Sequence, residues 1–119
     1  MLYTKKQSDL LKESIKKWVD IIQGSGCDHG ADNCALCKEY RIEKYIDERY
    51  TADCTNCPVK QTTGYNFCKE TPYIVWISLS CIHNSNGAKN LILYNAAVNE
   101  FDFLKSLYIK TILFRKFEI

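Results

Sequence analysis

Two pairs of cysteines with the same internal spacing stand in the middle of this chain of 119 residues. Two residues separate Cys34 from Cys37, two separate Cys54 from Cys57, and sixteen lie between the pairs. Two intervening residues let both sulfurs of a pair reach one ion while backbone N–H groups point at the thiolates. Two such pairs complete a tetrahedron and are typical of structural zinc sites. We therefore expect a structural Zn²⁺ at these four cysteines.

Other ligands and other chemistries stay open beside this prediction. Cys68 follows Cys57 by eleven positions, so it is a competing ligand that could replace Cys54 or Cys57. An iron–sulfur cluster also needs four cysteines, and spacing does not exclude it. A set of buried free thiols is the structural alternative, and it suits Cys81 better than the two pairs. A redox role is a weaker hypothesis, because neither pair follows a strand in a βαβ pattern.

The two histidines are weaker candidates. His29 stands two positions after Cys27, and the two side chains could form a ligand pair for a second metal or a variant quartet. We favour an exposed loop histidine at this position. His83 follows Cys81 by two positions, which is not a usual zinc half-site, and we expect a loop residue there too.

Size and charge limit the other possibilities. A chain of 119 residues most often forms one domain, and its small core gives modest stability, so a metal cross-link would supply much of the folding energy. The formal charge is +2. Four thiolates on one Zn²⁺ would bring the total to about zero, so net charge indicates no particular partner.

The start of the sequence predicts a cytoplasmic protein. It is polar and amphipathic, with no apolar run ahead of a small-residue cleavage site. No stretch approaches the roughly 18 apolar residues that a membrane span requires. Thiols stay reduced in the cytoplasm, which favours metal binding over disulfides, and the odd count of 7 cysteines excludes complete internal pairing.

Hydrophobic periodicity predicts a mainly α fold, with the N- and C-terminal helices packed together around a zinc-stabilised cysteine-rich middle, residues 27–73. Residues 5–23 form the first expected helix, with Ser8 as its N-cap and Gly24–Gly26 as its end. Its apolar stripe recurs at helical spacing: Leu11, Ile15, Trp18 and Ile22.

Three shorter elements are expected in the middle of the chain. Residues 40–50 are predicted to form a second helix, charged on one side. Pro58 suits the first position of a short helix that ends at Gly64. Thr71 and Pro72 favour a helix start, although the β-branched residues that follow leave a strand open.

One long helix is predicted for residues 89–117, after a turn at Asn86–Gly87. No glycine or proline interrupts it. A helical stripe runs along it: Tyr94, Ala97, Val98, Phe101, Leu104, Tyr108 and Ile112. Its last part is apolar on nearly every face, so we expect this end to be buried or to dock on a second copy as a homodimer.

Motifs for catalysis are missing from the sequence. It contains no nucleophile elbow, phosphate loop or paired catalytic carboxylates, and a four-thiolate zinc has no position for substrate. We therefore do not expect an enzyme. Lysines of residues 5–17 and basic residues of 105–116 could contact phosphates, but Asp9, Glu13 and Asp20 interrupt the first group, so solvated helix faces are the simpler interpretation.

Several segments together resemble a family of small cysteine-rich proteins of unknown function from bacteriophages and the bacteria that carry them. These segments are "SIKKW", "GADNCALCKEY", "CTNCPVKQTTGYNFCKETPY" and "EFDFLKSL". The resemblance covers about residues 13–107 and is most specific over 30–73. It implies that Cys34, Cys37, Cys54, Cys57 and Cys68 belong to the family pattern. It also implies a phage or mobile-element setting and no particular activity.

Two functions follow as hypotheses. The first is a small zinc-binding accessory protein that binds a host or phage protein, for example to inhibit a bacterial defence system. The alternative is a zinc-dependent regulator that binds nucleic acid. A small-molecule binder with its site at a dimer interface is a third possibility, supported only by the aromatic content of 13%.

Overall fold

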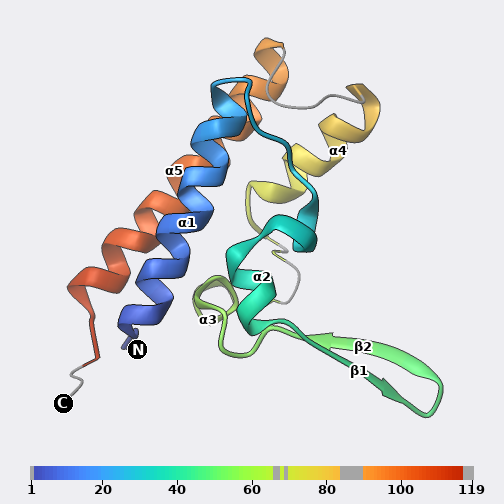
Figure 1. The fold of residues 1–119 in the computed structure, drawn as a ribbon, viewed down its shortest axis with the longest axis vertical. Helices are drawn as coiled ribbons and strands as arrows, with labels where there is room; N and C mark the ends of the chain where they lie inside the picture. Colours follow the sequence, from blue (N-terminus) through green and yellow to red (C-terminus); the bar gives the residue numbers. More distant parts are fainter. Residues whose placement is uncertain (1, 66–67, 69, 84–89, 117–119) are drawn as a thin grey trace.

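Two long helices form the frame of the molecule (Figure 1). The computed structural model describes residues 2–65, 68, 70–83 and 90–116. Helices α1 (Lys5–Ile22) and α5 (Leu91–Leu113) run antiparallel and pack against each other, so the two ends of the chain lie close together. The prediction of a mainly helical single domain is confirmed, and so is the packing of its first and last helices.

The core lies between α1, α5 and the cysteine-rich middle. Buried side chains from α1 and α5 meet there: Leu11, Trp18, Ile21, Leu93, Ala96, Ala97, Leu104 and Leu107. Trp76 completes the core from α4 (Tyr73–His83), and its ring meets the ring of Trp18 edge-on at 5.2 Å between centroids. Burial of large apolar side chains of this kind contributes roughly 1.5–3 kcal/mol each.

The cap of α1 differs from the prediction. Thr4 is the N-cap, and its hydroxyl accepts a hydrogen bond from the backbone N–H of Gln7 while the Gln7 side chain accepts from the N–H of Thr4. Ser8 was the wrong residue, because a reciprocal Thr–Gln capping box is available one turn earlier. Ser8 is instead buried inside the helix, and its hydroxyl donates to Oγ1 of Thr111 at 2.8 Å.

The two chain ends are also joined by backbone hydrogen bonds. The N–H of Tyr3 donates to the carbonyl of Phe114 at 2.9 Å, and the N–H of Lys116 donates to the carbonyl of Tyr3 at 2.6 Å. Tyr3 itself is buried. These bonds close the pair of helices at the end where the chain begins and stops.

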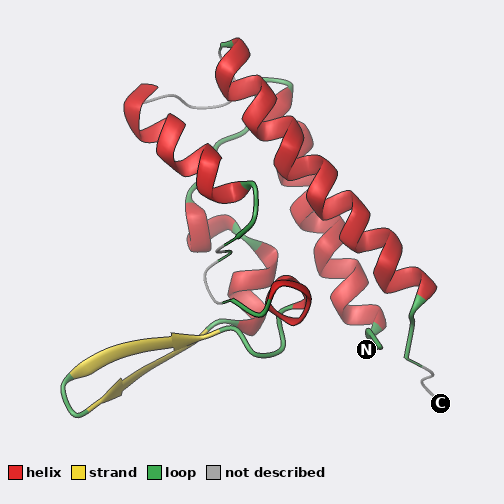
Figure 2. Cartoon of the chain, turned by 180° about the vertical axis from the view of Figure 1, so that it is seen from behind, coloured by secondary structure: helices red, strands yellow, loops and turns green. Residues whose placement is uncertain are grey.

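The predicted helix over residues 40–50 is wrong. A short helix α2 (Ala35–Tyr40) comes first, and an antiparallel hairpin of β1 (Ile42–Ile46) and β2 (Arg49–Asp53) follows. Asp47 and Glu48 form its turn, with φ angles of 50° and 64°. Two consecutive left-handed residues fit the tight turn that joins two strands, and no helix accommodates them. The hairpin projects away from the helical body (Figure 2).

The remaining elements agree with the prediction in type. Helix α3 (Pro58–Thr63) begins at Pro58 and ends at Gly64, whose φ of 82° is the left-handed cap that glycine adopts most easily. Helix α4 is a helix and not a strand, and the Thr71 hydroxyl accepts from the N–H of Tyr73 at its start. The cysteine-rich segment lies along one side of the α1–α5 pair (Figure 1).

The C-terminal helix is shorter at both ends than predicted. Asn90 caps it by accepting from the N–H of Leu93 at 2.9 Å, and the helix ends at Leu113. The predicted turn at Asn86–Gly87 and the end of the predicted helix at Phe117 lie outside the described residues. Within the described residues, no helix combines the length and apolar character that crossing a membrane requires.

Candidate metal centre

Five of the seven cysteines line one cavity of about 270 Å³. They are the four predicted zinc ligands and the competing ligand: Cys34, Cys37, Cys54, Cys57 and Cys68. They come from the start of α2, from the loop between β2 and α3, and from the segment before α4. The fold thus brings both pairs and Cys68 to the same space, although up to 34 positions separate them in the sequence.

The first pair is held by the start of α2. Cys34 is the N-cap of this helix, and its sulfur accepts from the backbone N–H of Cys37 at 3.4 Å. The Cys37 thiol donates a further hydrogen bond to the Cys34 sulfur, and this bond lowers the pKa of Cys34 to about 6 against the effect of burial. The same bond, together with burial, raises the pKa of Cys37. Cys34 is therefore the more easily ionised thiol of the pair.

The second pair lies before α3. Both Cys54 and Cys57 are buried, and the N–H of Cys57 donates to the carbonyl of Cys54 at 2.8 Å. Cys57 is the N-cap of α3. Burial raises the pKa of Cys57 to about 11, although the N–H groups of Val59 and Lys60 act in the opposite direction. Cys34 and Cys57 thus each lie at the start of a helix.

Cys68 reaches the cavity from a strained backbone position. Its φ is +58°, which costs a residue with a side chain about 1–2 kcal/mol. The Thr71 hydroxyl donates to the carbonyl of Cys68 at 2.6 Å and holds this conformation. Burial, with the charges of Cys34 and Glu100, raises the pKa of Cys68. Strain of this kind clusters at functional sites.

The cysteines of the cavity are of the kind that binds zinc, but the distances between their side chains are not those of a metal site. Thiolates are the ligands that structural zinc prefers, and the cavity offers five candidates. Among the described residues, however, no three His, Cys, Asp or Glu side chains already lie close enough together to hold an ion. Zinc binding therefore requires the sulfurs to move inward to roughly 2.3 Å from the ion.

Lys17, which lines the cavity, forms a largely buried ion pair with Asp28. Nζ of Lys17 lies 2.8 Å from Oδ1 of Asp28. The other oxygen of Asp28 accepts from the Tyr73 hydroxyl at 2.9 Å and from the Trp76 indole N–H at 3.0 Å. Burial alone would raise the pKa of Asp28, but Lys17 and the N–H of Gly30 hold it below its ordinary value. Asp28 is therefore ionised, and both of its oxygens form contacts that connect its loop to α1 and α4.

Glu100 is the site residue that the sequence analysis missed. It lines the cavity from α5 and is only 4% exposed, and no described residue forms a hydrogen bond with its Oε2. Burial, followed by the charge on Cys34, raises its pKa to about 8. A signal was present in the sequence, since Glu100 occupies the same helical face as Leu93 and Leu104, where an apolar residue is expected.

The other sequence candidates lie elsewhere. Cys27 does not line the cavity, and Asn33 donates to its carbonyl at 2.7 Å. His29 is exposed, as favoured from the sequence, and its backbone N–H donates to Oδ1 of Asn33. The side chains of Cys81 and His83 lie outside what the structure describes.

Comparisons with known proteins give no further assignment: no family model, no curated protein and no solved structure matches the chain.

Proposed function

We propose that this chain is a small zinc-binding accessory protein of a phage or mobile element, and that it acts by binding a host or phage protein. Its zinc is structural and is held by Cys34, Cys37, Cys54 and Cys57, with Cys68 as the competing ligand. The convergence of these five cysteines on one cavity supports the zinc site. The partner, in this proposal, binds elsewhere on the surface.

One observation above all supports a protein partner: α5 carries an apolar stripe beside its buried face. The buried face packs against α1 and α4. Phe101 and Tyr108 of the stripe are half-buried and also contact the core, whereas its other members extend toward the two ends of the helix. In the whole set, large apolar side chains recur at alternating steps of three and four residues: Leu91, Tyr94, Val98, Phe101, Tyr108 and Ile112. We call this set the outer stripe. Leu91 is 72% exposed and Ile112 48% exposed. Figure 2 shows α5 in front of α1.

The spacing of the outer stripe indicates the kind of partner. A repeat of three and four residues is the pattern by which one helix packs into the groove of another. Lys105 occupies the gap in the repeat, and its Nζ lies 5.9 Å from the centroid of the Phe101 ring. We therefore expect an apolar helical surface with an acidic side chain opposite Lys105. A second copy of the chain is the other occupant that the same surface could accept.

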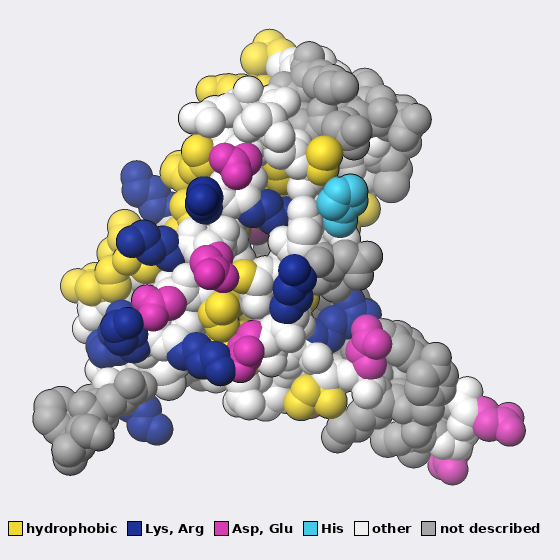
Figure 3. Space-filling view, viewed as in Figure 1, with side chains coloured by type: hydrophobic (Ala, Val, Ile, Leu, Met, Phe, Trp, Pro, Cys, Tyr) yellow, Lys and Arg dark blue, Asp and Glu magenta, His cyan; other side chains and the backbone are white. Residues whose placement is uncertain are grey.

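Nucleic-acid binding remains the alternative, but the charges favour it less. Four lysines lie in ion pairs with carboxylates: Lys5, Lys6, Lys17 and Lys60. Basic and acidic side chains alternate over the face in Figure 3. Nucleic-acid binding generally needs a continuous basic patch, and its affinity falls steeply with salt.

Capture from host lysate with matched variants tests the proposal. Tyr94→Glu and Ile112→Glu interrupt the outer stripe, while Ile42→Glu changes an equally exposed apolar residue on the hairpin. We expect a protein that the natural chain and Ile42→Glu retain and that both stripe variants lose. Retention by all four chains, or no specific protein at all, would contradict the proposal. Retention of nucleic acid that disappears at high salt would favour the alternative.

A further inference from the structure

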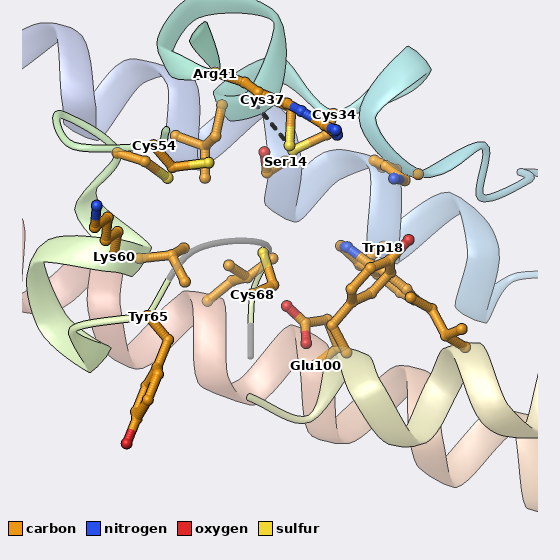
Figure 4. A pocket seen from close by; sticks show the side chains of 18 residues that line it. Ser14, Trp18, Cys34, Cys37, Arg41, Cys54, Lys60, Tyr65, Cys68 and Glu100 are labelled. Atoms are coloured by element: carbon orange, nitrogen blue, oxygen red, sulfur yellow. Dashed lines mark hydrogen bonds between the residues drawn. The ribbon is translucent and has the colours of Figure 1, made fainter. Parts of the chain in front are cut away.

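The cavity holds more anionic donors than one zinc ion needs. A structural zinc takes four thiolates. If it takes Cys34, Cys37, Cys54 and Cys57, then Cys68 and Glu100 remain in the same cavity. In Figure 4, Cys34, Cys37 and Ser14 lie on one side of the open space, and Cys68 and Glu100 lie together on the other.

The Glu100 carboxyl group is an incomplete site. Among the described residues, its Oε2 has no hydrogen-bond partner, although the residue is only 4% exposed. Oγ of Ser14, which also lines the cavity, is likewise buried and finds no partner in the described part of the chain. A buried polar group without a partner is destabilising, and native proteins rarely contain one without a reason. The carboxyl of Glu100 points into the cavity (Figure 4).

The cations of the cavity wall are already engaged. Three basic side chains line it: Lys17, Arg41 and Lys60. Each forms an ion pair with a carboxylate other than Glu100, namely Asp28, Glu43 and Asp53. The four thiolates with one zinc carry a charge of about −2, and a thiolate and a carboxylate would add about −2 more. A second divalent cation would neutralise this charge once the thiol and the carboxyl group have lost their protons.

We propose that Cys68 and Glu100 form a second metal position beside the structural zinc, an inference that rests on the zinc site proposed above. The thiolate of Cys68 and one carboxylate oxygen of Glu100 supply two ligands, and water completes the shell. A sulfur and an oxygen ligand suit Zn²⁺ or Co²⁺ better than Mg²⁺ or Ca²⁺. With two protein ligands, this ion exchanges readily, whereas the four-thiolate zinc does not.

Metal titration of four chains tests this position. The natural chain, Cys27→Ser, Cys68→Ser and Glu100→Gln are each loaded with Zn²⁺ and weighed by native mass spectrometry before and after a chelator. Cys27→Ser is the matched control, because it removes a thiol that lies outside the cavity. We expect two ions on the natural chain and on the control, of which the chelator removes one. Cys68→Ser and Glu100→Gln should bind the second ion roughly 100-fold more weakly and keep the first.

The outcomes separate this inference from the zinc site itself. One ion on the natural chain, or two ions on Glu100→Gln, overturns the second position and leaves the structural zinc intact. Loss of the tightly held ion from Cys68→Ser also overturns it, because Cys68 would then belong to the structural quartet. Absence of metal from every chain contradicts the proposed zinc site. If Glu100→Gln fails to fold, two measurements still show whether a second metal position exists. One is the metal count of Cys68→Ser, and the other is the absorption spectrum of the natural chain loaded with Co²⁺.

Discussion

Nζ of Lys17 and Oδ1 of Asp28 lie 2.8 Å apart, and their side chains are only 13% and 9% exposed. The pair joins α1 to the loop that leads into the cysteine region. Through Oδ2, Asp28 also receives hydrogen bonds from Tyr73 and Trp76. One carboxylate therefore connects the first helix, the cysteine-rich segment and α4.

Removal of this carboxylate charge should destabilise the fold. In Asp28→Asn, Lys17 loses its partner while it stays buried, and breaking a buried ion pair from one side costs about 3–5 kcal/mol. Chemical denaturation of the metal-free chain measures this. Asp9→Asn is the control, because its ion pair with Lys5 is exposed and should cost less than about 1 kcal/mol. Equal losses in both variants would show that the Asp28 pair has no special role.

The same pair predicts a dependence of stability on pH. The pKa of Asp28 lies below its ordinary value of 3.8, so folding favours the ionised form. The stabilisation is therefore fully present above pH 3.8 and is lost as the pH falls through the lower pKa of the folded state. Thermal unfolding between pH 7 and pH 2 should show a steeper loss for the natural chain than for Asp28→Asn. Parallel curves would contradict this assignment.

A buried hydroxyl pair should link α1 to α5. Ser8 donates to Oγ1 of Thr111 and accepts from Arg115, both at 2.8 Å. Ser8→Ala removes both bonds and should lower the free energy of unfolding by about 1–3 kcal/mol. Ser106→Ala, at an exposed position of α5, should change it by less than about 0.5 kcal/mol. Similar effects of the two changes would argue against the contact.

A substitution in the hairpin turn should change the free energy of unfolding in opposite directions for a hairpin and for a helix. Glu48 has a φ of 64°, which glycine adopts without strain. Glu48→Gly should therefore stabilise the chain by up to about 1 kcal/mol. In the helix that periodicity predicts for residues 40–50, the same change would destabilise by about 1 kcal/mol. Denaturant midpoints of the two chains give the sign directly.

The hairpin of β1 and β2 could not be predicted from the sequence pattern. Tyr40, Ile42, Tyr45 and Ile46 fit a helical face, and no glycine or asparagine in this segment announces a turn. The turn is made by Asp47 and Glu48 in left-handed conformations, which side-chain pattern alone does not reveal. The long helices were predictable because their periodicity extends over many residues and no proline or glycine interrupts it.

The candidate site was predictable in its cysteines and not in its carboxylates. Spacing indicated that Cys34, Cys37, Cys54 and Cys57 belong together, and the structure places them around one cavity. Glu100 is 32 positions beyond Cys68, so only the packing of α5 against the cysteine region could bring it there. Asp28 resembles an ordinary loop acid in the sequence, because its three side-chain partners come from α1 and α4.

Native mass spectrometry of protein purified without added metal tests the central claim, that the cysteine cavity holds zinc. We predict one zinc per natural chain that survives a chelator, its retention in Cys27→Ser, and its loss in a Cys34→Ser/Cys37→Ser double variant. The intact mass in the same spectra shows whether the outer stripe of α5 pairs two copies. A natural chain without metal, carrying only free thiols or disulfides, would contradict the account.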